Sequence, residues 1–524
     1  MCGILFALLA DADDANALAV VRDRFRRIAH RGPDHSGERV AAFGAGGAFF
    51  AGCHRLAIVN TRPEGNQPLI REDEEAVLIC NGQIYNAALV SSRGGLRSDV
   101  DAILQAHCDG AFESIDALAL ALDGDFAFVM VHRGTVFAGR DPVGVRPLFY
   151  GMGADFQCPV AFASEAKALQ GLPGVARIAV FPPGHVYDSA TDTFRRYTDV
   201  YVQAPRPDAT TYDAAADAVQ AALVAAVAKR VENSERPIAF LCSGGLDSSI
   251  VLSLAHAHLT AVGRGADLHA FSVEYGANSA DAMYAAMLCR QLGVRHTVVS
   301  FDWADVQANL FAVAKQVESF DPNSMRTAVP AYLLAKHIRT HTDYKVILSG
   351  EGADEVFMGY SLFMSATDGE AAHRESMRLV RDLHMFDMLR ADRCFAAWGL
   401  ELRVPFLDVD VLRTAFALPP RHRLFQGGVE KALLRHAFRG DTDLAAARVL
   451  DRQKERFSDG CGFGYVPALL AHLAPPGASD LESKQASEAW AYRTWFDARY
   501  PGLEGLIGGR QSATATATAA FMDS

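Results

Sequence analysis

Short apolar runs separated by turn-forming residues dominate residues 1–200. AVLIC (76–80) precedes an Asn-Gly pair, and DFAFVMVHRGTVFAGRD (125–141) carries two apolar runs on either side of an Arg-Gly pair. Strand–turn–strand patterns of this kind predict antiparallel sheets, with a turn at each pair. The spacing of apolar residues in VVRDRFRRIAH (20–30) predicts one of a few helices.

Beyond about residue 210 the periodicity changes. YDAAADAVQAALVAAVAKRV (212–231) has the spacing of an amphipathic helix. After it, strands are expected at 237–241, 268–273, 295–301 and 345–350. Helices are expected between them, at 247–259, 279–293 and 328–338. Alternation of this kind predicts a doubly wound parallel sheet. After about residue 360 the pattern is mostly helical.

The two patterns meet at VYVQAPRPDATTYD (200–213), which contains proline and lacks apolar periodicity. We therefore predict two domains, at 1–205 and 206–524. The first is an α+β sandwich of antiparallel sheets, and the second is an α/β domain with a doubly wound parallel sheet and added helices. The alternating Ala-Thr tail predicts disorder from about residue 510.

The composition of the chain limits the classes of partner that are expected. The chain has 524 residues and a formal net charge of −12, which argues against nucleic acid as a bulk partner. No apolar run reaches the ~18 residues of a membrane span, so no membrane partner is expected. The nine cysteines are scattered without a CxxC pair, which favours a reducing cytoplasm and gives no zinc spacing.

The stretch FLCSGGLDSSIVLSL (240–254) combines an apolar strand, a Ser-Gly-Gly turn and a helix. Two glycines let successive backbone N–H groups point at one anion, and the helix N-terminus adds its dipole. A bare Ser-Gly-Gly would equally suit an ordinary capped turn. The longer string SGGLDSS is more specific, and it is not a GxxxxGK[ST] phosphate loop.

SGGLDSS resembles the pyrophosphate loop of ATP pyrophosphatase-type enzymes, which cleave ATP to AMP and pyrophosphate. SGEGADEVFMGY (349–360) resembles the acidic loop of glutamine-dependent asparagine synthetases, and RQKERFSDGCG (452–462) resembles a further segment of that family. The matching strings run in family order from Cys2 to about residue 465.

The resemblance implies ATP and Mg²⁺ chemistry in the second domain. Asp247 and Asp354 would share the metal, Glu351 would act as a base or position the adenylate, and Lys454 would stabilise charge on the phosphates. The implied ATP contacts are Leu241, Ser243, Gly244, Gly245, Asp247, Ser248, Val273, Ser349 and Gly350. The implied aspartate contacts are Arg326, Asp387 and Arg390, each of which could equally be an ordinary salt-bridge residue.

The chain begins MCGILFALLA, so removal of Met1 would expose a cysteine with a free α-amino group. Asparagine synthetases of this type begin with a class II glutamine amidotransferase domain, an Ntn-hydrolase-type fold whose nucleophile is an N-terminal cysteine. Cys2 would fill that role. Asn81 and Gly82 would form the oxyanion hole. The implied glutamine contacts are Arg55, Leu56, Ala57, Ile58, Val59, Asn81, Gly82, Gln83 and Asp99.

Gln83 departs from the family pattern, which has a glutamate at this position. An amide oxygen attracts the substrate ammonium less strongly than a carboxylate does. We therefore expect weaker glutamine binding with activity retained.

The expected activity is ATP-dependent synthesis of asparagine from aspartate and glutamine-derived ammonia, through a β-aspartyl adenylate. The products would be AMP, pyrophosphate and glutamate. The resemblance also implies small-molecule substrates and a homodimer. Two alternatives stay open: an amide-forming enzyme acting on another acid, such as a β-lactam synthetase, and a catalytically silent regulator. β-Lactam synthetases lack the N-terminal cysteine, which is present here. A regulator without catalytic activity is disfavoured because the residues that the resemblance implies for catalysis are all present: Cys2, Arg55, Asn81, Asp99, the SGGLDSS loop, Glu351 and Lys454.

Overall fold

A computed structural model of the chain describes residues 1–11, 13–44, 46–91, 94–154, 158–202, 210–276, 279–366, 368–453, 464–474, 480–503 and 506. The chain divides into two compact units. The first comprises Met1–Asp199 and Ala396–Glu401, and the second comprises Val200–Phe395 and the described residues from Leu402 onward. The predicted boundary near 205, Lys454 and the tail beyond 510 lie outside the described residues.

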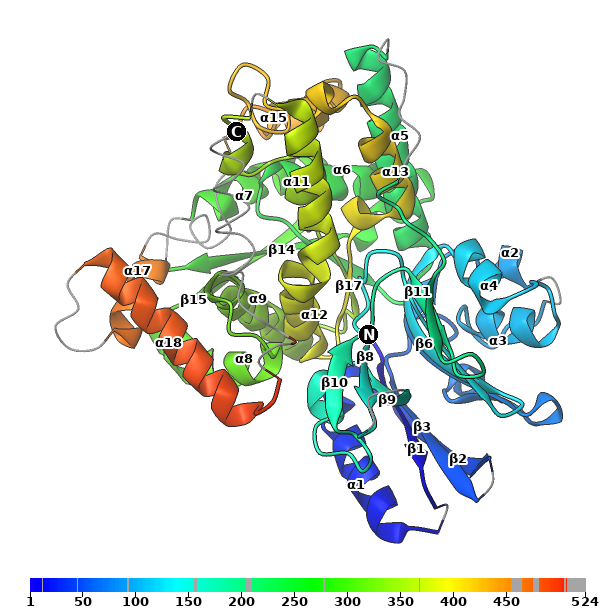
Figure 1. Ribbon diagram of the computed structural model, residues 1–524. Coiled ribbons are helices and arrows are strands. Elements are labelled where there is room, and N and C mark those ends of the chain that lie inside the picture. The colour runs from blue at the N-terminus through cyan, green and yellow to red at the C-terminus, as the bar shows by residue number, and fades with distance from the viewer. Residues whose placement is uncertain are drawn as a thin grey trace. The chain divides into compact units, whose positions relative to one another are not determined.

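Two antiparallel sheets build the first unit (Figure 1). The strand order of one sheet is β10 (Arg177–Val180), β8 (Phe149–Met152), β9 (Pro159–Ala163), β1 (Gly3–Leu9), β3 (Gly47–Arg55) and β2 (His35–Phe43). The order of the other is β12 (Thr193–Arg196), β11 (His185–Asp188), β7 (Thr135–Arg140), β6 (Gly124–His132), β5 (Ala76–Ile84) and β4 (Leu69–Arg71). These sheets confirm the antiparallel prediction.

The alternation of side chains along the strands places one apolar core between the two sheets. Phe6 and Phe49 of the first sheet share this core with Ile79 and Val129 of the second. Helices cover the outer faces. They are α1 (Ala15–Arg26) on the first sheet, and α2 (Ala87–Val90), α3 (Asp101–Cys108) and α4 (Ile115–Ala121) on the second.

The Asn-Gly pair is not a turn, which corrects the sequence-based expectation. β5 continues through Asn81 and Gly82, which pair with Ala127 and Phe126 of β6. A Cβ atom on Gly82 would lie 2.5 Å from the backbone oxygen of Asp125, so the glycine is required by close packing. The Arg-Gly pair does form the predicted turn, with φ angles of 48° and 77°.

The second unit contains a five-stranded sheet. Its order is β15 (Arg295–Phe301), β14 (His269–Tyr275), β13 (Ile238–Leu241), β16 (Val346–Leu348) and β17 (Glu401–Arg403). β13 pairs in parallel with β14 and β16, and β14 pairs in parallel with β15, as predicted.

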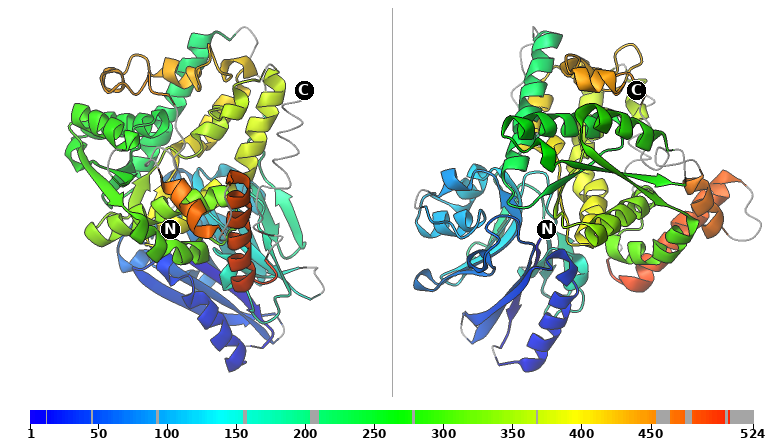
Figure 2. Two further views of the ribbon diagram at one scale, coloured as in Figure 1. Left: turned by 90° about the vertical axis from the view of Figure 1, so that its left-hand side faces the viewer. Right: turned by 180° about the vertical axis from the view of Figure 1, so that it is seen from behind.

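Helices lie on both faces of this sheet, with α6 (Leu246–Ala261) and α7 (Ala280–Leu292) on one face and α8 (Trp303–Val317) and α9 (Pro322–His341) on the other (Figure 2). The remaining described helices are α5 (Tyr212–Glu232), α10 (Ala353–Val356), α11 (Gly369–Asp382), α12 (Asp387–Ala396), α13 (Val409–Ala417), α14 (Ala432–Ala437), α15 (Thr442–Ala446), α17 (Tyr465–Leu473) and α18 (Leu481–Arg499).

α9 begins six residues before the helix expected at 328–338. The Asp321 side chain accepts a hydrogen bond from the Ser324 backbone N–H, and Pro322 occupies the first turn. An acidic cap followed by proline is a helix-start signal that apolar spacing alone does not register.

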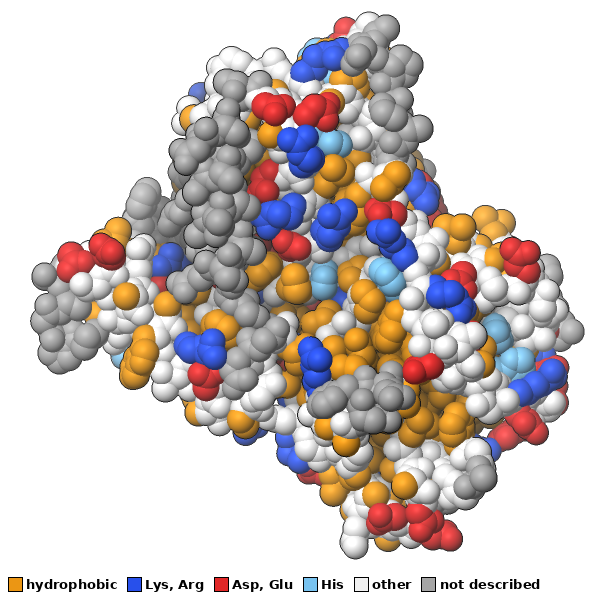
Figure 3. Space-filling view, in the orientation of Figure 1, with side chains coloured by type: hydrophobic (Ala, Val, Ile, Leu, Met, Phe, Trp, Pro, Cys, Tyr) orange, Lys and Arg blue, Asp and Glu red, His pale blue; other side chains and the backbone are white. Residues whose placement is uncertain are grey.

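No helix in the described ranges is both long and apolar enough to cross a membrane. On the face drawn in Figure 3, basic and acidic side chains are interspersed.

Candidate active sites

Cys2 lies immediately before β1, and its thiol is buried against Cys53 of β3. A hydrogen bond from the Cys53 thiol, together with the Met1 amine, the Leu56 backbone N–H and Arg55, lowers the pKa of Cys2 to about 6 against the opposing effect of burial. Burial and the neighbouring Cys2 raise the pKa of Cys53. Cys2 is therefore the thiol of this pair that ionises first, as a nucleophile requires.

Asn81 is fully buried on β5, and neither atom of its side-chain amide has a hydrogen-bond partner among the described residues. Leaving one such group unpaired costs about 1–3 kcal/mol, and buried polar groups are normally paired. An orphaned amide therefore indicates a position prepared for a ligand oxygen. This observation fits the oxyanion role predicted for Asn81.

Gln83 and Asp99 contact each other directly. The Gln83 amide donates a hydrogen bond of 2.9 Å to Asp99 Oδ2, which also accepts one of 2.8 Å from the Ile84 backbone N–H. A glutamate at position 83 would place a second negative charge beside Asp99. Gln83 replaces that repulsion with a hydrogen bond while removing one charge that could attract an ammonium group.

The Arg55 guanidinium is buried and shapes the loop that follows β3. It donates to the backbone oxygens of Val59, Asn60 and Arg62 and to the side chain of Asn66. These contacts hold in place the segment containing the predicted glutamine contacts Leu56, Ala57, Ile58 and Val59. Contact of Arg55 with a substrate carboxylate stays a prediction.

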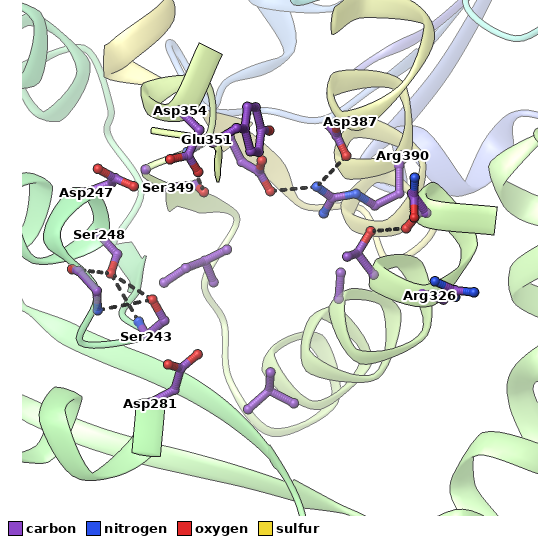
Figure 4. Close-up of a pocket in the computed structure, with 18 of the residues that line it drawn as sticks. Ser243, Asp247, Ser248, Asp281, Arg326, Ser349, Glu351, Asp354, Asp387 and Arg390 are labelled. Atoms are coloured by element: carbon purple, nitrogen blue, oxygen red, sulfur yellow. Dashed lines mark hydrogen bonds and ion pairs between the residues drawn. The ribbon is translucent and has the colours of Figure 1, made fainter. Parts of the chain in front are cut away.

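The second unit encloses a cavity of about 950 Å³. It is lined by residues that follow the carboxyl ends of the parallel strands, which is where ligands bind in open α/β sheets. The predicted residues on its wall are Leu241, Ser243, Gly245, Asp247, Ser248, Val273, Arg326, Ser349, Gly350, Glu351, Asp354, Asp387 and Arg390 (Figure 4).

The SGGLDSS loop lies with its backbone close to α7. Gly244 has a φ of 67°, and a Cβ atom there would lie 2.4 Å from the Ala285 backbone nitrogen. The Ser243 and Ser248 hydroxyls lie 3.2 Å apart, and α6 starts one residue after Gly245. The loop therefore leads directly into a helix N-terminus, which suits it to bind phosphate.

Lys431 was not anticipated from the sequence. It directly precedes α14, and its ammonium lies 2.5 Å from Asp247 Oδ2 and 2.7 Å from Asp354 Oδ1. The two predicted metal ligands are thus brought together around a cation. A positive charge at the start of a helix is unfavourable because it opposes the helix dipole. This unusual position is the only feature of the sequence that could have pointed to Lys431. No cluster of three or more His, Cys, Asp or Glu suited to a metal occurs within the described ranges.

Two arginines that sequence reasoning missed brace the SGGLDSS loop. Arg452 donates to the Ser243 backbone oxygen at 2.9 Å, pairs with Asp281, and stacks 4.6 Å from the centre of the Tyr284 ring. Arg435 in turn donates to the Arg452 backbone oxygen at 2.8 Å. Arg452 stands two residues before Lys454, at the start of RQKERFSDGCG (452–462).

Glu351, Arg390 and Asp387 form one charged group on the cavity wall. Arg390 lies 2.9 Å from Glu351 Oε1 and 3.7 Å from Asp387 Oδ1. Burial raises the pKa of Glu351, while Arg390 opposes that rise. Burial, with the charges of Asp387 and Asp354, also raises the pKa of the nearby Glu355 to about 8. Carboxyl groups with raised pKa values in a cavity are suited to proton transfer.

Arg326 reaches the cavity wall, but its guanidinium is engaged by Glu488 of α18. The two side chains form a bidentate pair at 3.1 and 2.6 Å, and Glu488 is completely buried. Arg326 therefore fastens α18 beside the cavity. Contact with aspartate stays a prediction for Arg326.

The sequence matches two family models. The model described as asparagine synthase covers residues 218–370 and 364–520, and the model described as glutamine amidotransferase domain covers residues 1–190. Asparagine synthetases named as glutamine-hydrolysing from Triphysaria versicolor and Asparagus officinalis are each 34% identical, over 552 and 553 residues. These alignments span 100% of this chain and 91% and 90% of the relatives.

The chain belongs to the glutamine-hydrolysing asparagine synthetases. The family resemblance seen in the sequence is thereby confirmed, and the family match extends to residue 520, well past the last matching motif near 465. Among solved structures, glutamine phosphoribosylpyrophosphate amidotransferase from B. subtilis matches with a TM-score of 0.31 and 20% identity. That match spans 50% of this chain and 64% of that chain.

The Cys2–Cys53 contact predicts a pH effect. Cys2 should react with iodoacetamide with a midpoint below the pH at which an ordinary thiol ionises, because the thiolate is the reactive form and the Cys53 hydrogen bond favours it. Cys53→Ala removes the largest stabilising contact and should move the midpoint upward. Mass spectrometry of the Cys2 peptide across pH measures this, with Cys394→Ala in the second unit as the control. An unchanged midpoint in Cys53→Ala would contradict the assignment.

The Arg326–Glu488 pair predicts separable effects. Arg326→Met and Glu488→Gln should both lower Tm, because each leaves a buried charged group without its partner. If Arg326 also contacts aspartate, only Arg326→Met should raise the KM for aspartate by tenfold or more. Steady-state kinetics beside thermal unfolding distinguishes the two roles, and equal KM values in both variants would reject direct contact.

Proposed function

We propose that this protein makes asparagine from aspartate and ATP, using ammonia that it releases from glutamine. The observation that carries the proposal is the pairing of two complementary sites in one chain. The first unit contains both a low-pKa cysteine and an orphaned buried amide, and the second unit contains a strand-to-helix loop suited to phosphate beside two carboxylates.

In the first site, removal of Met1 gives Cys2 a free α-amino group. The Cys2 thiolate attacks the side-chain amide carbon of glutamine, while the Asn81 amide and the Gly82 backbone N–H donate hydrogen bonds to the developing oxyanion. The α-amino group relays the proton to the departing ammonia, and water then hydrolyses the thioester to glutamate. Asp99 and Gln83 hold the substrate ammonium, and Arg55 holds its carboxylate.

In the second site, a side-chain carboxylate oxygen of aspartate attacks the α-phosphorus of ATP. The SGGLDSS backbone binds the departing pyrophosphate, which leaves a β-aspartyl adenylate. Ammonia then attacks the activated carbon, Glu351 accepts the surplus proton, and AMP departs. Activation is needed because a free carboxylate is a poor electrophile. Lys454 is expected to stabilise charge on the phosphates.

The residues fit the Mg²⁺ that this chemistry calls for. Asp247 and Asp354 both contact the ammonium group of Lys431, so their carboxylates can share one cation. Mg²⁺ prefers carboxylates as ligands, together with phosphate oxygens and water. They would hold the metal, which when bound neutralises phosphate charge. We extend the proposal to a cytoplasmic homodimer, for which the family resemblance is the support.

Cys2→Ala should abolish glutamine hydrolysis and leave synthesis from ammonium chloride within about twofold of wild type. The mutation removes the nucleophile but leaves the second unit unchanged. Separate glutaminase and ammonia-dependent assays provide the measurement, with Cys108→Ala as the matched control. Glutamine hydrolysis at the wild-type rate in Cys2→Ala would refute the role of Cys2.

The products test the proposal as a whole. With glutamine, aspartate and ATP–Mg²⁺, the reaction should yield asparagine, glutamate, AMP and pyrophosphate. Oxygen-18 in the side-chain carboxylate of aspartate should appear in AMP, because the adenylate passes one of those oxygens to phosphorus. ADP with orthophosphate would indicate an acyl phosphate and overturn the mechanism. AMP formed with another acid, but never with aspartate, would transfer the function to a related amide synthetase.

A further inference from the structure

Lys431 occupies the position between the two carboxylates assigned to the metal. Its ammonium contacts both Asp247 and Asp354, and its side chain is only 3% exposed. Asp247 comes from the first turn of α6 and Asp354 from α10, so three segments far apart in the sequence converge on one ammonium group. This convergence marks a position built for a cation.

The surrounding backbone is shaped to admit this lysine. A Cβ atom on Gly359 would lie 2.1 Å from Asp354 Oδ1 and 2.7 Å from Lys431 Cε. Lys431 itself has a left-handed backbone with a φ of 50°, which costs a residue with a Cβ about 1 kcal/mol or more. Its charge also opposes the dipole of α14. These local costs are offset by the attraction between the ammonium and the two carboxylates.

The same two carboxylates cannot hold an ammonium and a metal ion at one point. Mg²⁺ requires oxygen ligands at about 2.0–2.1 Å, so a bound metal would exclude the ammonium from its present position. A lysine has a flexible four-carbon stem and can withdraw its charge without unfolding the helix behind it. Lys431 therefore competes with metal when no nucleotide is present.

We propose that Lys431 is the resident counter-cation of Asp247 and Asp354, and that the divalent cation displaces it when it arrives with ATP. This inference rests on the proposed Mg²⁺ site. The phosphates supply additional oxygen ligands and negative charge, which favour exchange of the ammonium for the metal. The free protein should accordingly bind metal weakly, and metal should bind mainly as its complex with ATP.

Binding of Mn²⁺ alone to the nucleotide-free, full-length protein tests the inference. Electron paramagnetic resonance measures free Mn²⁺ during titration of wild type, Lys431→Met and Lys431→Gln. Both variants should bind Mn²⁺ at least tenfold more tightly than wild type, because the competing charge is gone. Lys431→Gln keeps a hydrogen-bond donor, and it gives the same test if Lys431→Met does not fold. The matched control is Lys229→Met, which removes a lysine 2.7 Å from Asp408 and should not change Mn²⁺ binding.

Thermal unfolding provides a second readout. In the absence of metal, Lys431→Met should have a lower Tm than wild type. Addition of Mg²⁺ should raise the Tm of Lys431→Met by more than it raises the Tm of wild type. Adding Asp354→Asn should remove both the tighter Mn²⁺ binding and the Mg²⁺ effect, which locates the gained site. Tighter binding that survives Asp354→Asn would overturn the proposal.

The two ideas fail in different ways. If Asp354→Asn alone binds Mn²⁺–ATP as tightly as wild type does, the metal site under the proposed function is wrong. If Asp354→Asn weakens Mn²⁺–ATP binding but both Lys431 variants bind Mn²⁺ alone no better than wild type, only the displacement by metal is wrong.

Discussion

The second unit depends on compensation of negative charge where loops meet at the carboxyl ends of a parallel sheet. Asp247 and Asp354 approach each other because Lys431 lies between them. Without a cation, two carboxylates this close would repel each other and leave one of them protonated. The positions of α6, α10 and the segment before α14 are thus linked through one ammonium group.

Ion pairs also compensate the charges of other side chains around the cavity. Arg452 pairs with Asp281 and braces the SGGLDSS loop, Arg390 pairs with Glu351, and Arg326 pairs with Glu488. Each partner comes from a different part of the chain, so each pair fixes the distance between two elements. Burying such charges is costly, and these pairs fix geometry more than they add stability. The result is a cavity whose polar groups are oriented before substrate arrives, as electrostatic catalysis requires.

The first unit prepares its site in the opposite way. Its distinguishing group is not a balanced charge but an unpaired amide, that of Asn81, held rigid in the middle of a strand. Cys53 meanwhile donates a hydrogen bond that favours the Cys2 thiolate. A strand fixes the position of a side chain more reliably than a turn would. The continuation of β5 through Asn81 and Gly82 therefore fixes the position of the unpaired amide.

The sequence by itself determined the parallel sheet and the antiparallel sheets, because these depend on local periodicity. For the SGGLDSS loop and Cys2 it predicted phosphate-binding and nucleophilic roles, through strings of adjacent residues that resemble those of a known family. It misplaced the Asn-Gly turn, because pairing with β6 overrides a local turn preference. It also missed Lys431, Arg452 and Glu488, whose roles depend on contacts across 184, 209 and 162 residues. Only the tertiary structure decided those partners, since ion pairing depends on distance in space and leaves no periodic trace in the chain.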